Sequence, residues 1–183
     1  SLTFGYTQNP TVSPNLINAY DLIDERLPLA QYVSVSGDLR VPQKYFDILS
    51  TSNNVGNDII VLRYADILLM YAEVLNEEGY VSADDSPAFQ SLNTVRERAG
   101  LLPLTTTELV DQVTFRASVL KERRLELALE FHRWYDLKRT NTAISTFSVL
   151  GVTVPECRLI YPIPQDEIDI VADLVRFPQN ACY

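Results

Sequence analysis

Several residue types are scarce in this chain of 183 residues, and each shortage excludes a kind of site. The six glycines lie at least nineteen positions apart, so the chain has neither a glycine-rich phosphate loop nor a dinucleotide fingerprint. His132 is the only histidine, which excludes a metal site with several histidine ligands and leaves a catalytic triad only one possible base. Its helical, aromatic surroundings favour a structural role. We expect no cofactor and no metal ion.

Positive charge is also in short supply. Fifteen Lys and Arg residues stand against 24 Asp and Glu residues, and the net charge of −9 would repel a nucleic-acid backbone. No apolar run approaches the roughly 20 residues that span a bilayer, and no signal-peptide pattern opens the chain. Hydrophobic residues make up 46%, as in an ordinary folded domain, and the length fits one domain or part of a larger one.

Cysteine occurs only twice, at Cys157 and Cys182. The two residues lack the close spacing of a metal knuckle or a redox pair. They are either two free thiols or a disulfide, and a disulfide requires an oxidising compartment.

Proline and glycine divide the chain into two segments of one domain. Residues 1–58 are rich in Pro, Gly and Asn, which favours loops, with one short helix expected to begin at Pro14 with Ser13 as its cap. Residues 59–183 are expected to form a mainly helical region.

The first two expected helices form a hairpin. Apolar residues at helical spacing predict a helix from Ile59 to a stop at Gly79, with contacts on two sides. A second helix is expected from Pro87 to Gly100. The short link makes an antiparallel pair about the size of one tetratricopeptide unit.

A third helical region is expected to be the longest element. It opens at a capping box formed by Thr105 and Glu108, breaks near residues 112–114 and continues to about Leu137.

The end of the chain is expected to be less regular. β-Branched residues between positions 144 and 154 predict a small hairpin around Gly151. Prolines then keep the tail extended, with one helical turn at residues 165–168, as a strap lying across the helices.

Charged residues at helical spacing predict a structural ion-pair network. Glu122, Glu126 and Glu130 recur every four residues, with Arg123 three positions before Glu126. A carboxylate pair for glycoside hydrolysis is not excluded by counting, but this spacing favours ion pairs between neighbouring helices. The expected network consists of Arg96, Arg98, Glu122, Arg123 and Glu126.

Aromatic residues of the first segment are the candidate ligand contacts. Aromatic side chains bind sugars by stacking on the faces of pyranose rings, and loops on a rigid scaffold often carry such sites. Tyr6, Tyr32 and Tyr45 lie in or beside this segment. The alternative is that they belong to the core or to an interface; Trp134, the only tryptophan, is expected to be buried.

Separated segments in a fixed order carry a family resemblance. They are residues 63–73, 92–101, 122–139 and 159–168, with 179–183 at the end. Together they resemble the C-terminal part of the SusD/RagB family, glycan-binding lipoproteins of the Bacteroidetes outer membrane. The family usually closes on Gln-Asn-Pro-Gly-Tyr, whereas Ala181 and Cys182 take the proline and glycine places here.

The resemblance implies a mainly α fold with tetratricopeptide-like helical hairpins, irregular loops and an extended C-terminal strap. It further implies that this chain is the later part of a surface-exposed outer-membrane lipoprotein whose lipid anchor lies outside it. Such a protein binds oligosaccharides without catalysis and delivers them to a SusC-like TonB-dependent transporter. The matching segments resemble scaffold, so no ligand residue is carried over from the family.

The inferred cell surface is oxidising, which favours a disulfide between the two cysteines. Two other functions remain open. One is a helical-repeat interaction scaffold without a small ligand, and the other is a carbohydrate-active enzyme.

Overall fold

The computed structural model describes residues 12–30, 32–33, 40–41, 43–45, 56, 58, 60–173 and 175–183. The chain forms two compact units, Ser1–Arg133 and Trp134–Tyr183. Each unit is described by itself.

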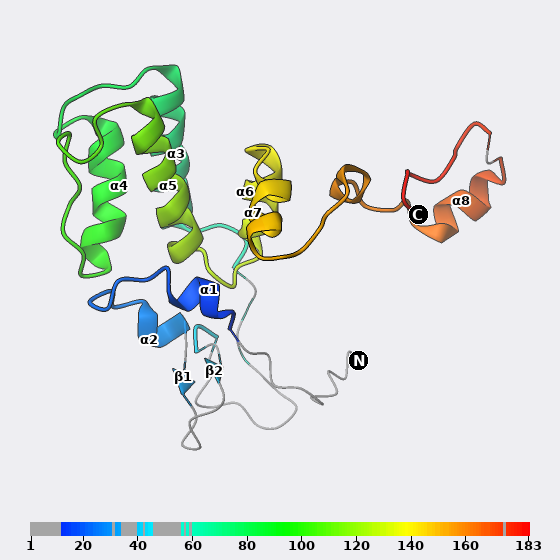
Figure 1. The fold of residues 1–183 in the computed structure, drawn as a ribbon, viewed down its shortest axis with the longest axis horizontal. Coiled ribbons are helices and arrows are strands. Elements are labelled where there is room, and N and C mark those ends of the chain that lie inside the picture. The colour runs from blue at the N-terminus through cyan, green and yellow to red at the C-terminus, as the bar shows by residue number, and fades with distance from the viewer. Residues whose placement is uncertain are drawn as a thin grey trace. The chain divides into compact units, whose positions relative to one another are not determined.

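Three helices build the core of the first unit. They are α3 (Tyr64–Glu78), α4 (Pro87–Arg98) and α5 (Gln112–Glu126), which lie side by side (Figure 1). Removing apolar surface from water is the main force that holds them together. Their buried side chains are Leu69, Ala72, Phe89, Leu92, Val95, Leu109, Phe115 and Val119. The mainly α, tetratricopeptide-like fold predicted from the sequence is therefore confirmed.

Helices α3 and α4 both end at a glycine, but the backbone conformations of Gly79 and Gly100 differ. Gly79 follows α3 with a φ of 166°, an extended conformation that any residue adopts. Gly100 follows α4 with a φ of +74°, in the left-handed region that favours glycine. A Cβ added to Gly100 would also lie 3.0 Å from Cγ of Glu25. Only the second position requires glycine.

The prediction of one long third helical region is wrong, because this part of the chain forms a single turn and two separate helices. Thr105 and Glu108 close a single turn, and the N-cap of α5 is Asp111, whose side chain accepts a hydrogen bond from the Thr114 amide at 2.8 Å. Helix α5 ends at Glu126, and a non-helical link leads to α6 (His132–Arg139). At 15 residues α5 only equals α3 in length.

The link between α5 and α6 departs from the sequence expectation at two apolar residues. Leu129 and Phe131 have φ values of 69° and 66°, which a continuous helix does not allow. Phe131 is largely exposed.

The N-terminal segment packs on the end of α5. It contains α1 (Pro14–Ile17), α2 (Leu27–Ala30) and two strands, β1 (Tyr32–Val33) and β2 (Arg40–Val41), which pair antiparallel. A second apolar cluster joins this segment to the helix. Its members are Val12, Ile17, Tyr20, Ala30 and Leu125.

The second unit contains a helix where the sequence predicts a hairpin. Helix α7 (Ala143–Val149) replaces the expected extended segment, and Gly151 follows it with a φ of +75°. Phe147 of α7 packs against Trp134, with ring centroids 6.1 Å apart. This long-range contact outweighs the weak β preference of the branched residues.

The rest of the second unit is held by local ties. A 3-10 helix covers Glu156–Leu159, and α8 (Gln165–Val171) extends the single predicted turn. Gln179 and Ile163 exchange two hydrogen bonds, of 2.8 and 2.9 Å. These contacts fasten the end of the chain to the segment before α8.

Candidate functional site

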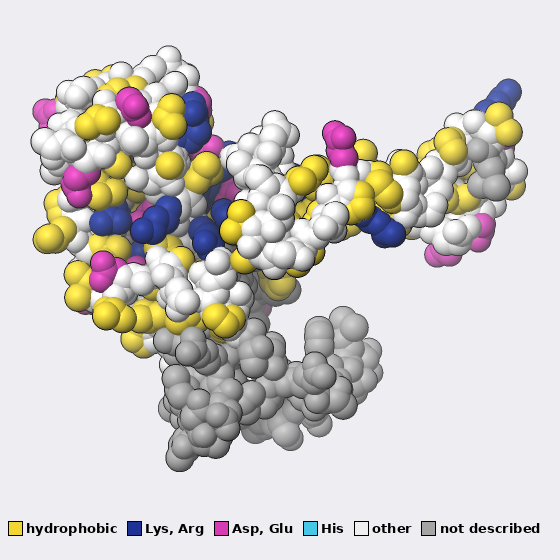
Figure 2. Space-filling model, in the orientation of Figure 1, with side chains coloured by type: hydrophobic (Ala, Val, Ile, Leu, Met, Phe, Trp, Pro, Cys, Tyr) yellow, Lys and Arg dark blue, Asp and Glu magenta, His cyan; other side chains and the backbone are white. Residues whose placement is uncertain are grey.

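Buried carboxylates gather at the C-terminal end of α5. Glu122 and Glu126 lie one helical turn apart, each 2% exposed, and the buried Glu130 follows in the link to α6. An unpaired buried carboxylate is strongly unfavourable, so each of them requires a cation. Figure 2 shows Lys and Arg side chains gathered in a band between the three helices and the α1–α2 segment.

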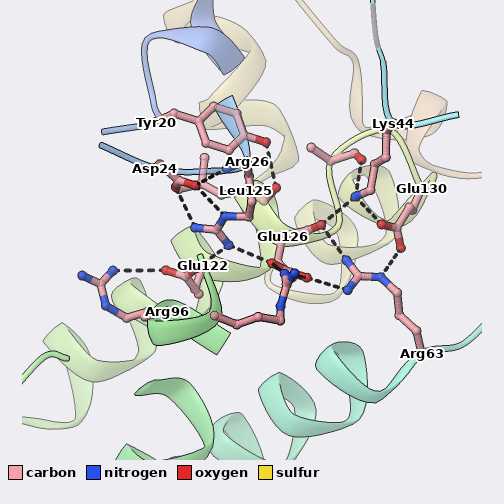
Figure 3. Close-up of polar contacts among 12 residues, drawn as sticks. Tyr20, Asp24, Arg26, Lys44, Arg63, Arg96, Glu122, Leu125, Glu126 and Glu130 are labelled. Atoms are coloured by element: carbon pink, nitrogen blue, oxygen red, sulfur yellow. Dashed lines mark hydrogen bonds and ion pairs between the residues drawn. The ribbon is translucent and has the colours of Figure 1, made fainter. Parts of the chain in front are cut away.

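Arg26 links the N-terminal segment to α5 (Figure 3). Its guanidinium forms two parallel hydrogen bonds to Asp24, of 2.9 and 2.8 Å. Its Nη1 atom donates to Glu122 at 2.6 Å and to Glu126 at 2.9 Å. The segment before α2 is thereby attached to a helix about a hundred residues later in the chain.

Glu126 is the centre of the cluster. Besides Arg26, its carboxylate accepts from Arg63 at 2.5 Å and from Arg98 at 2.6 and 2.7 Å. Its backbone carbonyl accepts from Arg63 at 2.6 Å and from Lys44 at 2.7 Å. Cations from three separate regions of the chain therefore converge on one residue.

The other pairs surround this centre. Arg96 donates to Glu122 at 3.2 Å, and Glu130 receives both Lys44 and Arg63. Together these contacts form the buried charge cluster. Its members are Asp24, Arg26, Lys44, Arg63, Arg96, Arg98, Glu122, Glu126 and Glu130.

Arg123 belongs to a neighbouring contact. Its Nη1 atom donates to the buried carboxylate of Asp66 on α3 at 2.7 Å. The contact joins α5 to α3. Four of the five residues in the expected network belong to the buried charge cluster; they are Arg96, Arg98, Glu122 and Glu126. The fifth, Arg123, joins α5 to α3.

The cations lower the pKa of two of the carboxylates, Glu126 and Glu130. Burial alone would raise the pKa of Glu126, yet hydrogen bonds from Arg63 and Arg26 lower it below its ordinary value. The pKa of Glu130 is lowered against the effect of burial by Arg63 and Lys44. Burial raises the pKa of Tyr20, whose hydroxyl donates to the Leu125 carbonyl at 2.8 Å, to about 12.

This arrangement suits a scaffold. A glycoside hydrolase needs a proton-donating carboxyl with a raised pKa, whereas Glu126 and Glu130 have lowered pKa values and face guanidinium groups. A cavity of about 290 Å³ adjoins the cluster, and its walls include Tyr20, Leu29 and Arg63. In the described part of the chain, no group of three or more His, Cys, Asp or Glu side chains is arranged to hold a metal ion.

The pattern of a known family matches most of the chain. The SusD family matches residues 37–183. This chain belongs to the SusD family. Two SusD-like proteins of Formosa agariphila are relatives, one 33% identical over 175 residues and the other 36% identical over 134 residues. These matches cover 87% and 69% of this chain but only 34% and 25% of the relatives, so the chain spans about a third of their length or less.

Solved structures give the same assignment. A laminarin-binding SusD-like protein is 26% identical, with a TM-score of 0.64 over 97% of this chain and 41% of that one. Surface glycan-binding protein A from Bacteroides thetaiotaomicron has a TM-score of 0.68 over 94% of this chain and 45% of that one. Its identity of 22% supports the fold alone. The family resemblance seen in the sequence is thus confirmed.

Of the tyrosines expected to contact ligand in this SusD-family chain, one has a described side chain. Tyr6 lies outside the described residues, and Tyr32 is described only as backbone of β1. Tyr45 is half-buried, and burial together with the negative charge of Glu130 raises its pKa. Trp134, expected to be buried, is half-buried.

Several members of the buried charge cluster are absent from the network expected from the sequence. Asp24 and Arg26 have only a weak signal, because they flank Glu25 in a short charged run between the apolar residues Ile23 and Leu27. Arg63 opens the first segment of SusD-family resemblance, although its partners lie more than sixty residues away. Lys44 carries no such signal, since it lies in a loop-rich region.

In the part of the SusD-family chain that the structure describes, no helix combines the length and apolar character needed to cross a membrane.

Proposed function

We propose that this protein binds glycans at the cell surface, without catalysis, and delivers them to a SusC-like TonB-dependent outer-membrane transporter. The match to the SusD family over residues 37–183 carries the proposal. Two structural neighbours are named for glycan binding, one of them for laminarin. Because the chain spans less than half of each neighbour, the proposal concerns the full-length protein.

The buried charge cluster supports binding over hydrolysis. Its carboxylates serve as acceptors for Arg and Lys side chains, and the lowered pKa of Glu126 and of Glu130 makes both poor proton donors at neutral pH. We assign the cluster to the scaffold that holds the N-terminal segment against α5. A glycan site would then lie on the loops that this scaffold positions.

Tyr6, Tyr32 and Tyr45 remain the proposed glycan contacts. Aromatic faces stack on the apolar faces of pyranose rings, and base-like or acidic groups are not needed for such binding. The half-buried Tyr45 lies beside the cluster, which would hold it in place while one part of the ring stays accessible.

Calorimetric titration of the full-length protein with laminarin, followed by a glycan array, tests the proposal. We expect saturable binding and no release of products. Tyr45→Ala should weaken binding about tenfold, since loss of one stacking contact of about 1–1.5 kcal/mol has that effect. Tyr135→Ala, which removes a tyrosine that is 61% exposed in the second unit, should leave the affinity unchanged. Absence of binding across the array, or turnover lost in one carboxylate variant, would contradict the proposal.

Surface display is part of the same proposal. We expect the full-length protein to carry an N-terminal lipid anchor and to copurify with the transporter. Protease treatment of intact cells and labelling with a fatty-acid analogue test these two expectations. A protein that resists external protease and takes up no label would contradict the surface location.

A helical interaction scaffold is the second candidate function, and one observation favours it. The face of α3 formed by Tyr64, Ile67, Tyr71 and Val74 is exposed, although the sequence predicts contacts on two sides of this helix. A row of apolar side chains at helical spacing is typical of a surface that packs against another helix. Tyr71→Glu should abolish association with a protein partner under this function and leave laminarin binding unchanged.

A further inference from the structure

A second cavity lies between the end of α3, the start of α4 and the start of α5. Its volume is about 280 Å³, close to the lower end of the range for small-molecule sites. Tyr80, Phe89 and Phe115 form an aromatic wall, with ring centroids 4.8 to 6.3 Å apart. The exposed residues Glu78 and Gly79 belong to its rim.

Two buried polar atoms on the cavity lining have no partner. Asn76 is 1% exposed, and its Nδ2 atom donates to the Gln112 carbonyl at 3.1 Å and to Glu77 at 3.3 Å. These acceptors determine the orientation of the amide, which leaves Oδ1 as an unpaired acceptor. Ser86 is 7% exposed, and its hydroxyl is also unpaired.

The position of Ser86 makes its unpaired hydroxyl informative. The residue is the N-cap of α4, where a serine side chain usually accepts a hydrogen bond from the helix, but here it makes no such bond. Buried polar groups in folded proteins are almost always hydrogen-bonded. An apolar cavity lined by two residues with unpaired polar atoms has the composition of a small-ligand site.

We propose that this cavity binds a small neutral phenol. The aromatic ring would pack against the wall of Tyr80, Phe89 and Phe115, and the ligand hydroxyl would donate to Oδ1 of Asn76 while the Ser86 hydroxyl bonds to the same ligand. A pyranose fits less well, because most of its hydroxyl groups would lose water and face apolar walls. Tyr45, the proposed glycan contact whose side chain is described, does not line this cavity.

The negative charge beside the cavity favours a neutral ligand over an anionic one. Glu78 is the charged residue among those that line the cavity, since Glu77 is paired with Arg116, so a phenolate or a carboxylate would be repelled. A phenol with its ordinary pKa near 10, like that of tyrosine, stays neutral at pH 7.

Titration with p-cresol tests the proposal by two-dimensional amide NMR. We expect saturable shifts confined to residues 75–89 and around Phe115. Toluene, which lacks the hydroxyl, should bind about tenfold more weakly, because Asn76 would remain unpaired. A crystal soaked in p-cresol should show the ring in the cavity.

Matched variants distinguish specific binding in the cavity from non-specific binding of p-cresol to apolar surface. Ser86→Ala should weaken p-cresol binding about fivefold, whereas Ser91→Ala, the same change at a hydroxyl bonded to the Pro87 carbonyl, should not change it. Gly79→Leu places a side chain on the rim at an extended residue where a Cβ meets nothing within 4 Å, so it should fold normally and reduce binding at least tenfold.

Three results would overturn the proposal. One is the absence of shifts up to the solubility limit of p-cresol. Another is equal affinity of the parent, Ser86→Ala and Gly79→Leu. The last is a soaked crystal in which water alone bridges Asn76 and Ser86.

Discussion

At the scale of single residues, Glu126 makes more long-range contacts than its position at the end of one helix suggests. Arg26, Arg63 and Arg98 all donate to its carboxylate. Removal of that carboxylate would leave the five cations of the cluster with three carboxylates, although Arg26 would keep Asp24 and Glu122 and Arg63 would keep Glu130.

Glu126→Ala should therefore lower the free energy of unfolding by about 3–5 kcal/mol, the usual effect of breaking a buried ion pair. Urea denaturation followed by circular dichroism measures the change. Glu77→Ala is the matched control, because Glu77 also pairs with an arginine, Arg116, but is 43% exposed at its side chain. It should change stability by no more than about 1 kcal/mol. Equal midpoints for parent and Glu126→Ala would show that the cluster does not hold the fold.

The lowered pKa values of Glu126 and Glu130 predict how stability depends on pH. The unfolded chain binds more protons than the folded chain near the ordinary glutamate pKa of 4.5, so stability rises with pH in this range. The contribution is fully present above about pH 5 and is lost as the pH falls below 4.5 through the folded values. Urea midpoints between pH 3 and 7 should show this loss, with a smaller pH dependence for Glu126→Gln. A flat profile in the parent would contradict the assignment.

At the scale of elements, two helix ends that look alike in the sequence have different backbone conformations and surroundings. Gly79 and Gly100 both end helices, but only Gly100 has a left-handed backbone and a close neighbour. The sequence pattern treats them alike, since it detects that a helix stops and not the conformation in which it stops.

Gly100→Ala should lower the free energy of unfolding by about 1–2 kcal/mol, because an L-residue in the left-handed region is strained and the new Cβ would crowd Glu25. Thermal and urea denaturation measure the loss. Gly79→Ala provides the comparison: its backbone is extended and open, so its stability should stay within about 0.5 kcal/mol of the parent. Similar losses in both variants would show that the backbone conformation at residue 100 is not the cause.

The link at residues 127–131 is the element that local rules describe least well. Continuous helical spacing of apolar residues predicts one helix through it, yet Leu129 and Phe131 adopt positive φ values. The backbone carbonyls of Glu126 and Ala128 both accept hydrogen bonds from Lys44. A distant side chain therefore takes part in ending α5, and a helical pattern read in one window does not contain that information.

At the scale of the whole molecule, a disulfide cross-links the second unit. Cys157 and Cys182 form a disulfide with their Cα atoms 5.8 Å apart, and it closes the segment that contains α8. Within the described residues no cysteine is left free. The inferred oxidising location agrees with this pairing.

Replacing both cysteines by alanine should loosen the end of the chain, since loops of this size contribute up to about 3 kcal/mol on the chain-entropy estimate. Hydrogen exchange at the Ile163 amide, which donates to Gln179, should become faster while exchange in α3 to α5 stays unchanged. Alkylation of the native parent without reductant gives an independent check. Two labelled thiols in that experiment would rule out the disulfide in the folded protein.

By itself, the sequence determined the helical class, the α3–α4 hairpin, the scaffold charges on α4 and α5 and the family. These follow from short-range periodicity and from motifs that lie within a few turns. Only the tertiary structure decided that Arg26, Lys44 and Arg63 complete the cluster, that α7 replaces a hairpin and that Asn76 and Ser86 share a cavity. The physical reason is that a buried charge or polar atom takes its partner from whatever lies nearest in space, and that neighbour can be a hundred residues away.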